Sequence, residues 1–219
     1  MATSTETGFK SASIACISRH RIVIDGEGVR TLVVMQGCPL RCRYCINPFA
    51  MDYKGLCKHY TPQHLLEELM PDNLYFLATK GGITFGGGEP ALQSDFIAQF
   101  HAIRPKAWSI HIETSLNVPQ HQIEQLAPIT ERFVVDIKDM NPAIYKQYTG
   151  CDNHPVKNNL RWLTSQGMAE NIVVRVPQIP DYNTEEDIRR SIEELQSTGI
   201  KHFDRFTYRL PEHHDKQTN

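Results

Sequence analysis

The chain has 219 residues, a formal net charge of −2, and 40% hydrophobic and 22% charged residues. This composition is ordinary for a globular protein with one sizeable core, and it argues against nucleic acid or an anionic membrane as the main partner. No run approaches the ~18 apolar residues of a membrane span, and no signal-peptide pattern occurs in the first residues, MATSTETGFKSAS. We therefore expect a cytoplasmic protein.

The N-terminal segment, residues 1–13, is mostly small and polar, and we expect it to be flexible. Residues 14–219 contain no repeat, low-complexity segment or charge block, so we interpret them as a single domain. Its first strand is expected at 30–36, in a β-rich apolar run.

Cys38, Cys42 and Cys45 follow that strand in one short loop, with the spacing C-x3-C-x2-C. Thiolates are soft ligands that select iron–sulfur clusters, zinc or copper(I). A structural zinc ion takes four ligands, and Cys57 or His59 could supply the fourth. Otherwise the loop leaves one coordination position open. A disulfide framework of the six cysteines is disfavoured in a reducing cytoplasm.

A helix is expected at 61–70, where Thr61 can act as the N-cap. The next strand, 82–85, leads into GGGEP at 86–90, and a second helix is expected at 92–103. The glycines alone would explain a tight turn. They would also let a ligand approach the backbone closely, beside a charge from the glutamate.

The strand expected at 108–113 ends in Glu113 and is followed by Thr114, with a helix after it at 119–127. A carboxylate and a hydroxyl at this position could bind a ribose or a monovalent cation. They could equally cap a helix.

Asp136 and Lys138 end the strand expected at 132–138, and their spacing of two predicts that they point to the same side. A solvated salt bridge is the alternative to a ligand site. Arg175 lies in the strand expected at 171–176, where a cation is costly unless a carboxylate pairs with it.

Further helices are expected at 155–167 and 184–199, and a last strand at 203–208. Six strands that alternate with helices predict a parallel α/β sheet with right-handed crossovers. Six units are too few for a closed eight-stranded barrel, which leaves an open, partial barrel or a doubly wound sheet. Ligands should gather at the carboxyl ends of the strands, where the motifs above stand.

The spacing C-x3-C-x2-C is the signature of the radical S-adenosylmethionine (radical SAM) enzymes. The wider stretches DGEGVR (25–30) and QGCPLRCRYCIN (36–47) resemble the activating enzymes of glycyl-radical enzymes, of which pyruvate formate-lyase activating enzyme is the type member. The resemblance covers most of the chain and implies a partial (β/α)6 barrel. It also implies that Cys38, Cys42 and Cys45 hold a 4Fe-4S cluster whose open iron binds S-adenosylmethionine. Because 49–60 contains one cysteine, we expect a single cluster.

The resemblance assigns the cofactor contacts residue by residue. The GGE of GGGEP would hold the methionine amino group, Asp136 and Lys138 would contact S-adenosylmethionine, and Arg209 stands where the family has a histidine on the adenine. A monovalent cation beside the methionine is also implied. The complete set of predicted cofactor-binding residues is Tyr44, Ile46, Gly87, Gly88, Glu89, Glu113, Thr114, Asp136, Lys138, Arg175 and Arg209.

The resemblance implies cleavage of S-adenosylmethionine to methionine and a 5′-deoxyadenosyl radical, which takes a hydrogen atom from a glycine Cα of a partner glycyl-radical enzyme. No side chain is then needed as a general base. Flavodoxin or ferredoxin would supply the electron, and we expect an anaerobic setting and a monomer. Two alternatives stay open: another radical SAM enzyme that acts on a small molecule, and a non-catalytic zinc or iron–sulfur binding module.

Overall fold

The computed structural model describes residues 10–23 and 26–208. Its centre is an eight-stranded sheet with the order β3-β1-β2-β4-β5-β6-β7-β8, in which the strands from β2 to β8 are parallel to one another. The strands are β1 (Ala12–Val23), β2 (Gly26–Met35), β3 (Lys58–Tyr60), β4 (Gly82–Gly87), β5 (Ser109–Thr114), β6 (Arg132–Asp136), β7 (Ile172–Gln178) and β8 (His202–Thr207). The predicted α/β fold with a mostly parallel sheet is confirmed.

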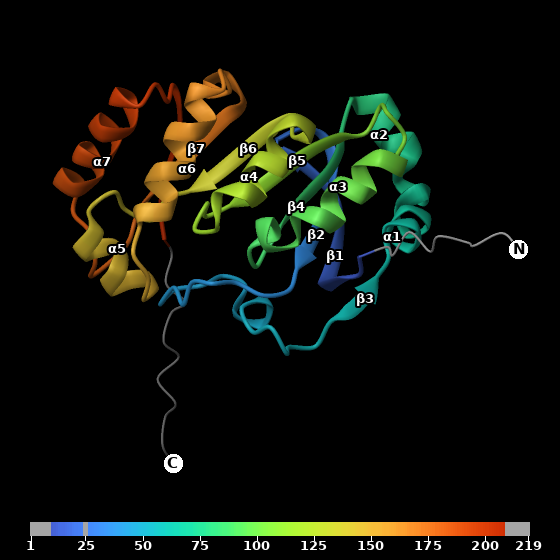
Figure 1. Ribbon diagram of the computed structural model, residues 1–219, viewed down its shortest axis with the longest axis horizontal. Coiled ribbons are helices and arrows are strands. Elements are labelled where there is room, and N and C mark those ends of the chain that lie inside the picture. Colours follow the sequence, from blue (N-terminus) through green and yellow to red (C-terminus); the bar gives the residue numbers. More distant parts are fainter. Residues whose placement is uncertain (1–9, 24–25, 209–219) are drawn as a thin grey trace, which may run out of the picture.

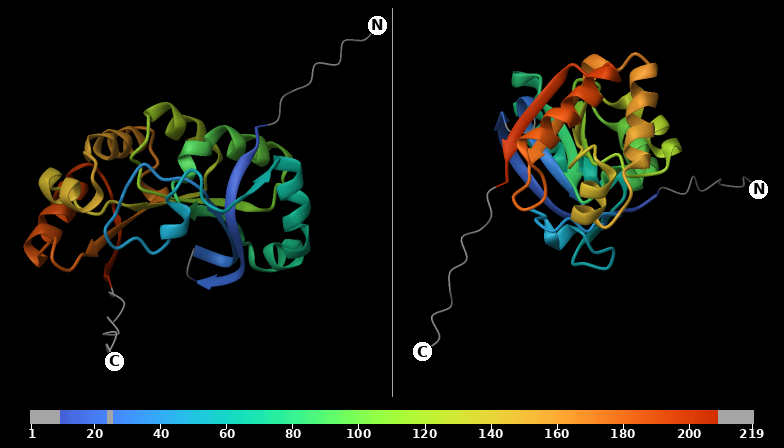
Figure 2. Two further views of the ribbon diagram at one scale, coloured as in Figure 1. Left: turned by 90° about the horizontal axis from the view of Figure 1, so that it is seen from below. Right: turned by 90° about the vertical axis from the view of Figure 1, so that its left-hand side faces the viewer.

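Helices connect the parallel strands, and α3, α4 and α6 lie over one face of the sheet (Figure 1). In the end-on view of Figure 2, helices line the upper and right-hand sides of the curved sheet. The helices are α1 (Pro62–Leu69), α2 (Asn73–Thr79), α3 (Ser94–Ile103), α4 (Gln120–Leu126), α5 (Pro142–Thr149), α6 (His154–Ser165) and α7 (Glu185–Ser197). No helix within the described ranges has the length and apolar character needed to cross a bilayer.

The two faces of the sheet differ in chemistry because side chains alternate along each strand. Ile110 and Ile112 of β5 and Phe133 of β6 belong to the main hydrophobic core. By the same alternation, Glu113 and Asp136 point to the opposite face. This second face carries the charged residues of the site.

Arg30 of β2 lies on the second face and is only 1% exposed. Its Nε donates to Thr84 Oγ1 at 2.8 Å, and its Nη1 donates to Ser109 Oγ at 2.8 Å. The guanidinium therefore joins β2, β4 and β5 near the start of the latter two strands. Its hydrogen bonds stabilise the amino end of the sheet, whereas the site described below lies at the carboxyl end.

Helix starts follow the expected local chemistry. Thr61 Oγ1 accepts a hydrogen bond of 3.2 Å from the backbone N–H of His64 at the start of α1. At the start of α7, Thr184 Oγ1 accepts from Asp187 N at 3.3 Å, and Asp187 Oδ2 accepts from Thr184 N at 2.9 Å. This second arrangement is a capping box.

Four elements were missed by the sequence prediction, namely β1, β3, α2 and α5. Strand β1 pairs antiparallel with β2, and irregular register between Ile14 and Cys16 and between Ser18 and Arg21 interrupts its alternation. It begins at Ala12, inside the segment 1–13 that we expected to be flexible. Residues 1–9 are outside the described ranges.

The prediction that the strand after 131 extends to Lys138 was wrong by two residues. Strand β6 ends at Asp136, and Lys138 has a φ of 61°. Such a left-handed conformation is rare for a residue other than glycine, and it turns the chain out of the sheet. Asp136 and Lys138 nevertheless meet, as described below.

Candidate functional site

The cysteine loop leaves the carboxyl end of β2 and runs along the lower edge of the molecule towards α5 (Figure 1). Within it, Leu40 is buried, and Arg41 donates from its Nη1 to the carbonyl oxygens of Cys38 at 2.7 Å and Leu40 at 2.8 Å. The backbone N–H of Arg41 donates to Thr149 O at 2.8 Å. The loop is thus fixed by its own arginine and by the end of α5.

The thiols of Cys38, Cys42 and Cys45 are half-buried and unpaired. Burial raises the pKa of Cys38 to about 12 and that of Cys42 to about 11, with smaller contributions from neighbouring cysteines. In the described ranges, no group of three cysteine, histidine or acidic side chains encloses a position for a single metal ion.

That arrangement bears on which metal group could fit. A zinc ion draws its ligands around one point, and the described residues form no such group, with or without Cys57 and His59. A 4Fe-4S cluster is held by thiolates on different irons, so its ligands stand farther apart. Three unpaired thiols on one fixed loop are compatible with this larger group.

The glycine-rich turn after β4 packs directly against the start of the cysteine loop. Gly88 N donates to Met35 O at 3.0 Å, and Glu89 N donates to Gly37 O at 2.8 Å. A Cβ added to Gly88 would lie 2.3 Å from Gly37 O, closer than any real side chain allows. Glycine at this position is therefore required for the two motifs to meet.

The Glu89 side chain is fully buried. Its carboxylate accepts hydrogen bonds from Ala91 N (3.1 Å), Thr114 Oγ1 (2.7 Å), Ser115 N (2.9 Å) and Ser115 Oγ (2.6 Å). Burial raises the pKa of Glu89, although these donors favour the charged form. The side chains of Glu89 and Thr114 thus bind each other, and the backbone of the turn is the part left to contact a ligand.

Lys138 forms an ion pair with Asp136, and its Nζ also donates to Tyr208 Oη at 3.2 Å. Burial disfavours the ammonium, but the negative charge of Asp136 outweighs this and raises the pKa of Lys138 well above its ordinary value. The charge of Lys138 lowers the pKa of Cys42 and that of Asp136 raises it, both by less than burial does. Asp136 Oδ1 is buried without a partner in the described ranges, so a donor group of a bound ligand would satisfy it.

Arg175 of β7 reaches across the neighbouring strand β6 to β5. Its Nη2 lies 3.0 Å from Glu113 Oε1, and its Nε lies 3.6 Å from Asp204 Oδ2 on β8. Although burial works against the charged form, Glu113 and the other carboxylates raise the pKa of Arg175. The carboxylate partner expected for Arg175 is therefore supplied by the protein itself.

Comparison with known proteins decides the family. Residues 32–195 match the family model described as "Radical SAM superfamily". The chain belongs to the radical SAM superfamily.

Named relatives of this radical SAM protein are activating enzymes. The chain is 30% identical to the (2S)-3-sulfopropanediol dehydratase activating enzyme of Klebsiella oxytoca, with 73% of this chain and 69% of the relative covered. It is 31% identical to the pyruvate formate-lyase-activating enzyme of Staphylococcus aureus (75% and 67% covered). It is 28% identical to the pyruvate formate-lyase 1-activating enzyme of Escherichia coli K12, with the same coverage. The predicted resemblance to activating enzymes is confirmed.

Solved structures support the radical SAM fold. Streptococcus suis SuiB bound to S-adenosylmethionine superposes with a TM-score of 0.63 at 14% identity, covering 81% of this chain and 40% of SuiB. Coproporphyrinogen III oxidase (HemN) from Escherichia coli, a radical SAM enzyme, gives a TM-score of 0.51 at 14% identity, covering 66% and 36%.

The structure brings most of the predicted radical SAM site residues to one end of the sheet, but not all in the same way. Tyr44 donates from its hydroxyl to Asp181 Oδ2 at 3.3 Å, while Ile46 is 80% exposed. Arg209 lies outside the described ranges. Their contacts with S-adenosylmethionine stay predictions.

An aromatic cluster around Tyr44 was missed by sequence reasoning. The Tyr44 ring lies 6.0 Å from Tyr148 and 5.7 Å from Tyr182, and Tyr148 lies 6.3 Å from Tyr208, all between ring centroids. These tyrosines come from the cysteine loop, α5, the β7–α7 connection and the end of β8. No local pattern links them, because only the fold brings such distant segments together.

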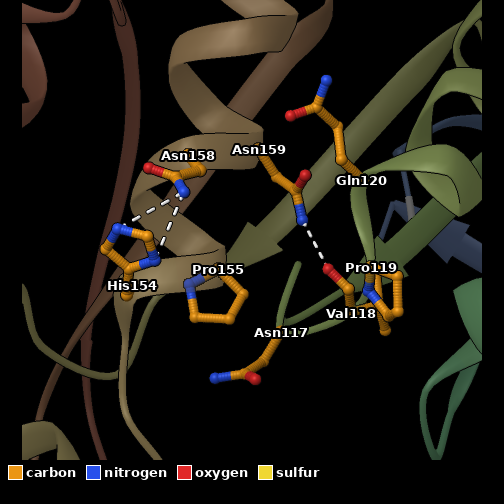
Figure 3. A pocket seen from close by; sticks show the side chains of 8 residues that line it. All are labelled: Asn117, Val118, Pro119, Gln120, His154, Pro155, Asn158 and Asn159. Atoms are coloured by element: carbon orange, nitrogen blue, oxygen red, sulfur yellow. Dashed lines mark hydrogen bonds between the residues drawn. The ribbon is translucent and has the colours of Figure 1, made fainter.

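A separate groove lies between the β5–α4 connection and the start of α6 (Figure 3). Asn159, one of the lining residues, donates to Val118 O and Leu116 O, both at 2.9 Å. None of the predicted radical SAM site residues lines it. Its lining consists of Asn117, Val118, Pro119, Gln120, His154, Pro155, Asn158 and Asn159.

Proposed function

We propose that this chain is a radical SAM activating enzyme that binds one 4Fe-4S cluster through Cys38, Cys42 and Cys45 and acts on a partner glycyl-radical enzyme. The observation that carries the proposal is the contact between two motifs, in which Glu89 N and Gly88 N bind the backbone at Gly37 and Met35. A structural metal site would not need a glycine-rich turn against its ligand loop. The names of the relatives favour a protein substrate over a small molecule.

When bound, the cluster supplies the electron that cleaves S-adenosylmethionine to methionine and a 5′-deoxyadenosyl radical. The protein's part is to bind and orient. The backbone of Gly87, Gly88 and Glu89 offers groups for the methionine amino group. The Lys138 ammonium offers a charge for the carboxylate. Asp136 Oδ1, which has no partner among the described residues, offers an acceptor.

Further parts of the proposal concern groups around the site. A monovalent cation could use Asp136 Oδ1, whereas Glu113 already pairs with Arg175. Flavodoxin or ferredoxin would be the electron donor, and the protein would act as a monomer in the cytoplasm. The small-molecule and binding-module alternatives would share the cysteine loop, so they must be separated by experiment.

Anaerobic reconstitution with iron and sulfide, followed by reduction and addition of S-adenosylmethionine, tests the reaction class through release of 5′-deoxyadenosine. We expect release from the wild-type chain and none from Cys42→Ala. Adding a candidate glycyl-radical enzyme should then give a glycyl radical signal in electron paramagnetic resonance. A colourless protein that keeps one zinc ion and releases no 5′-deoxyadenosine would instead support the binding module.

A further inference from the structure

Exposed apolar and cationic side chains are concentrated between the cysteine loop and β3. Phe49 is 53% exposed, Tyr53 56% and Leu56 98%. Residues 38–60 contain four arginine or lysine residues and a single acidic residue, Asp52, although the whole chain has a net charge of −2. We define the docking surface as Phe49, Tyr53 and Leu56 together with the exposed cations Lys54 and Lys58.

The docking surface is attached to the cysteine loop by its backbone. Gly37 N donates to Ala50 O at 2.8 Å, and Cys38 N donates to Met51 O at 3.2 Å. The Tyr53 ring lies against Gly37, where an added Cβ would be 2.8 Å from its Cδ1. A partner bound to this surface would therefore sit next to the first cluster cysteine.

The cations of the docking surface are not used inside the chain. Within the described ranges, the side chains of Lys54 and Lys58 have no ion-pair or hydrogen-bond partner. Arg41 differs, because it bonds the carbonyl of Cys38. Exposed apolar side chains beside cations that lack an internal partner are typical of a surface that binds a partner of the opposite charge.

The position of the docking surface favours an electron donor over the substrate protein. It leads into β3, the edge strand beyond β1, whereas Asp136, Lys138 and Tyr208 lie at β6 and after β8 on the other side of the sheet. A protein substrate must reach the S-adenosylmethionine site. An electron donor needs only to approach the cluster closely, because electron tunnelling falls steeply with distance.

We propose that the docking surface binds an acidic one-electron carrier protein, an inference that rests on the proposed function above. One electron leaves the reduced carrier, which is oxidised by one electron, and enters the cluster at Cys38, Cys42 and Cys45. The cations attract and orient the carrier, and Phe49, Tyr53 and Leu56 exclude water from the contact.

The test uses the reconstituted protein and an acidic flavodoxin. Two variants change the docking surface, Lys54→Glu/Lys58→Glu and Leu56→Ser. Two matched controls make the same kinds of change at exposed positions that precede β4 and β5 in the chain. They are Lys80→Glu/Lys106→Glu and Leu74→Ser. Binding of oxidised flavodoxin is measured by calorimetry at low and high ionic strength.

We expect the double charge reversal to weaken binding at least about tenfold at low salt and to remove most of its salt dependence. Leu56→Ser should weaken binding several-fold, and both controls should bind like the wild type. The rate of cluster reduction by reduced flavodoxin should fall in the same order. Dithionite, which needs no docking, should reduce every variant equally and support 5′-deoxyadenosine release.

If both docking-surface variants bind flavodoxin and are reduced by it as the wild type is, the inference is overturned. Release of 5′-deoxyadenosine with dithionite would in that case still support the proposed function. A wild-type chain that releases no 5′-deoxyadenosine even with dithionite would overturn both. A dimer that Leu56→Ser converts to a monomer, with flavodoxin reduction unchanged, would show a self-association surface and overturn the electron-donor assignment.

Discussion

The carboxylate of Glu89 accepts a hydrogen bond of 2.7 Å from the hydroxyl of Thr114. Because Glu89 N also donates to Gly37 O, one residue joins the ends of β4 and β5 to the cysteine loop. Its side chain is thereby a brace for the site, and the contacts expected of a cofactor fall to the backbone around it.

Replacing Glu89 should test this brace. Glu89→Ala leaves the buried donors of Thr114 and Ser115 without their acceptor, so we expect a loss of about 2–4 kcal/mol in the free energy of unfolding. Glu89→Gln keeps the shape and should lose less. Urea unfolding of the metal-free proteins measures both, and equal stability of Glu89→Ala and wild type would contradict the brace.

Glu89 should also leave a signature in the pH dependence of stability. Its pKa is raised above 4.5 in the folded chain by burial, so the folded state holds a proton that the unfolded state releases. Between the pKa of Glu89 in the unfolded chain and its raised pKa in the folded chain, the folded state binds more protons. The free energy of unfolding therefore falls as the pH rises through this range. The difference in unfolding free energy between wild type and Glu89→Gln should shrink over this range as the pH rises, and a flat difference would count against it.

Gly88→Ala should separate the two motifs. The new methyl group would clash with Gly37 O at 2.3 Å, and relief of this clash should cost about 1–3 kcal/mol and lower the iron bound per chain. Gly199→Ala is the control, since Gly199 has a φ of 94° but no atom within 4 Å of an added Cβ. It should lose roughly 1–2 kcal/mol from backbone strain yet bind iron normally. Equal iron contents in the two variants would argue against a steric requirement at Gly88.

Lys138→Met should weaken S-adenosylmethionine binding without loss of iron. A charge-assisted contact is worth about 1.5–3 kcal/mol, so we expect calorimetry to give a dissociation constant roughly ten to a hundred times larger. Lys106→Met, at an exposed site, controls for the loss of a positive charge. Lys138→Arg keeps the charge beside Asp136 and should recover part of the affinity. Unchanged affinity in Lys138→Met would remove this residue from the cofactor site.

Thr184→Ala should affect stability alone. The variant loses the capping box of α7, which should cost about 1 kcal/mol and lower Tm by roughly 2–4 °C. S-adenosylmethionine affinity should stay at the wild-type value, because in the described ranges the Thr184 side chain bonds to Asp187 of its own helix and to none of the predicted site residues. Scanning calorimetry and the binding assay together check both halves of this expectation.

The sequence predicted the parallel strands and the position of the motifs at their carboxyl ends, because buried strands and the cysteine, glycine and acidic motifs are local signals. It failed for β1, whose irregular pairing breaks the alternation, and for α5, where the start signal of Asn141 and Pro142 was present but overlooked. It could not supply partners that depend on tertiary structure. Glu113 and Arg175 are 62 residues apart in the chain, and only the order of β5, β6 and β7 brings them together.

The cysteine loop takes backbone partners from a segment more than a hundred positions away, since Arg41 N binds Thr149 O and Arg43 N binds Tyr148 O. Regions linked in this way tend to open together as one cooperative unit. Removal of the metal should therefore speed amide hydrogen exchange in the last turn of α5 as well as in the loop itself, while β4 and β5 stay protected. Loss of the metal would therefore be detectable by hydrogen exchange in α5, a helix that contains none of the predicted ligands.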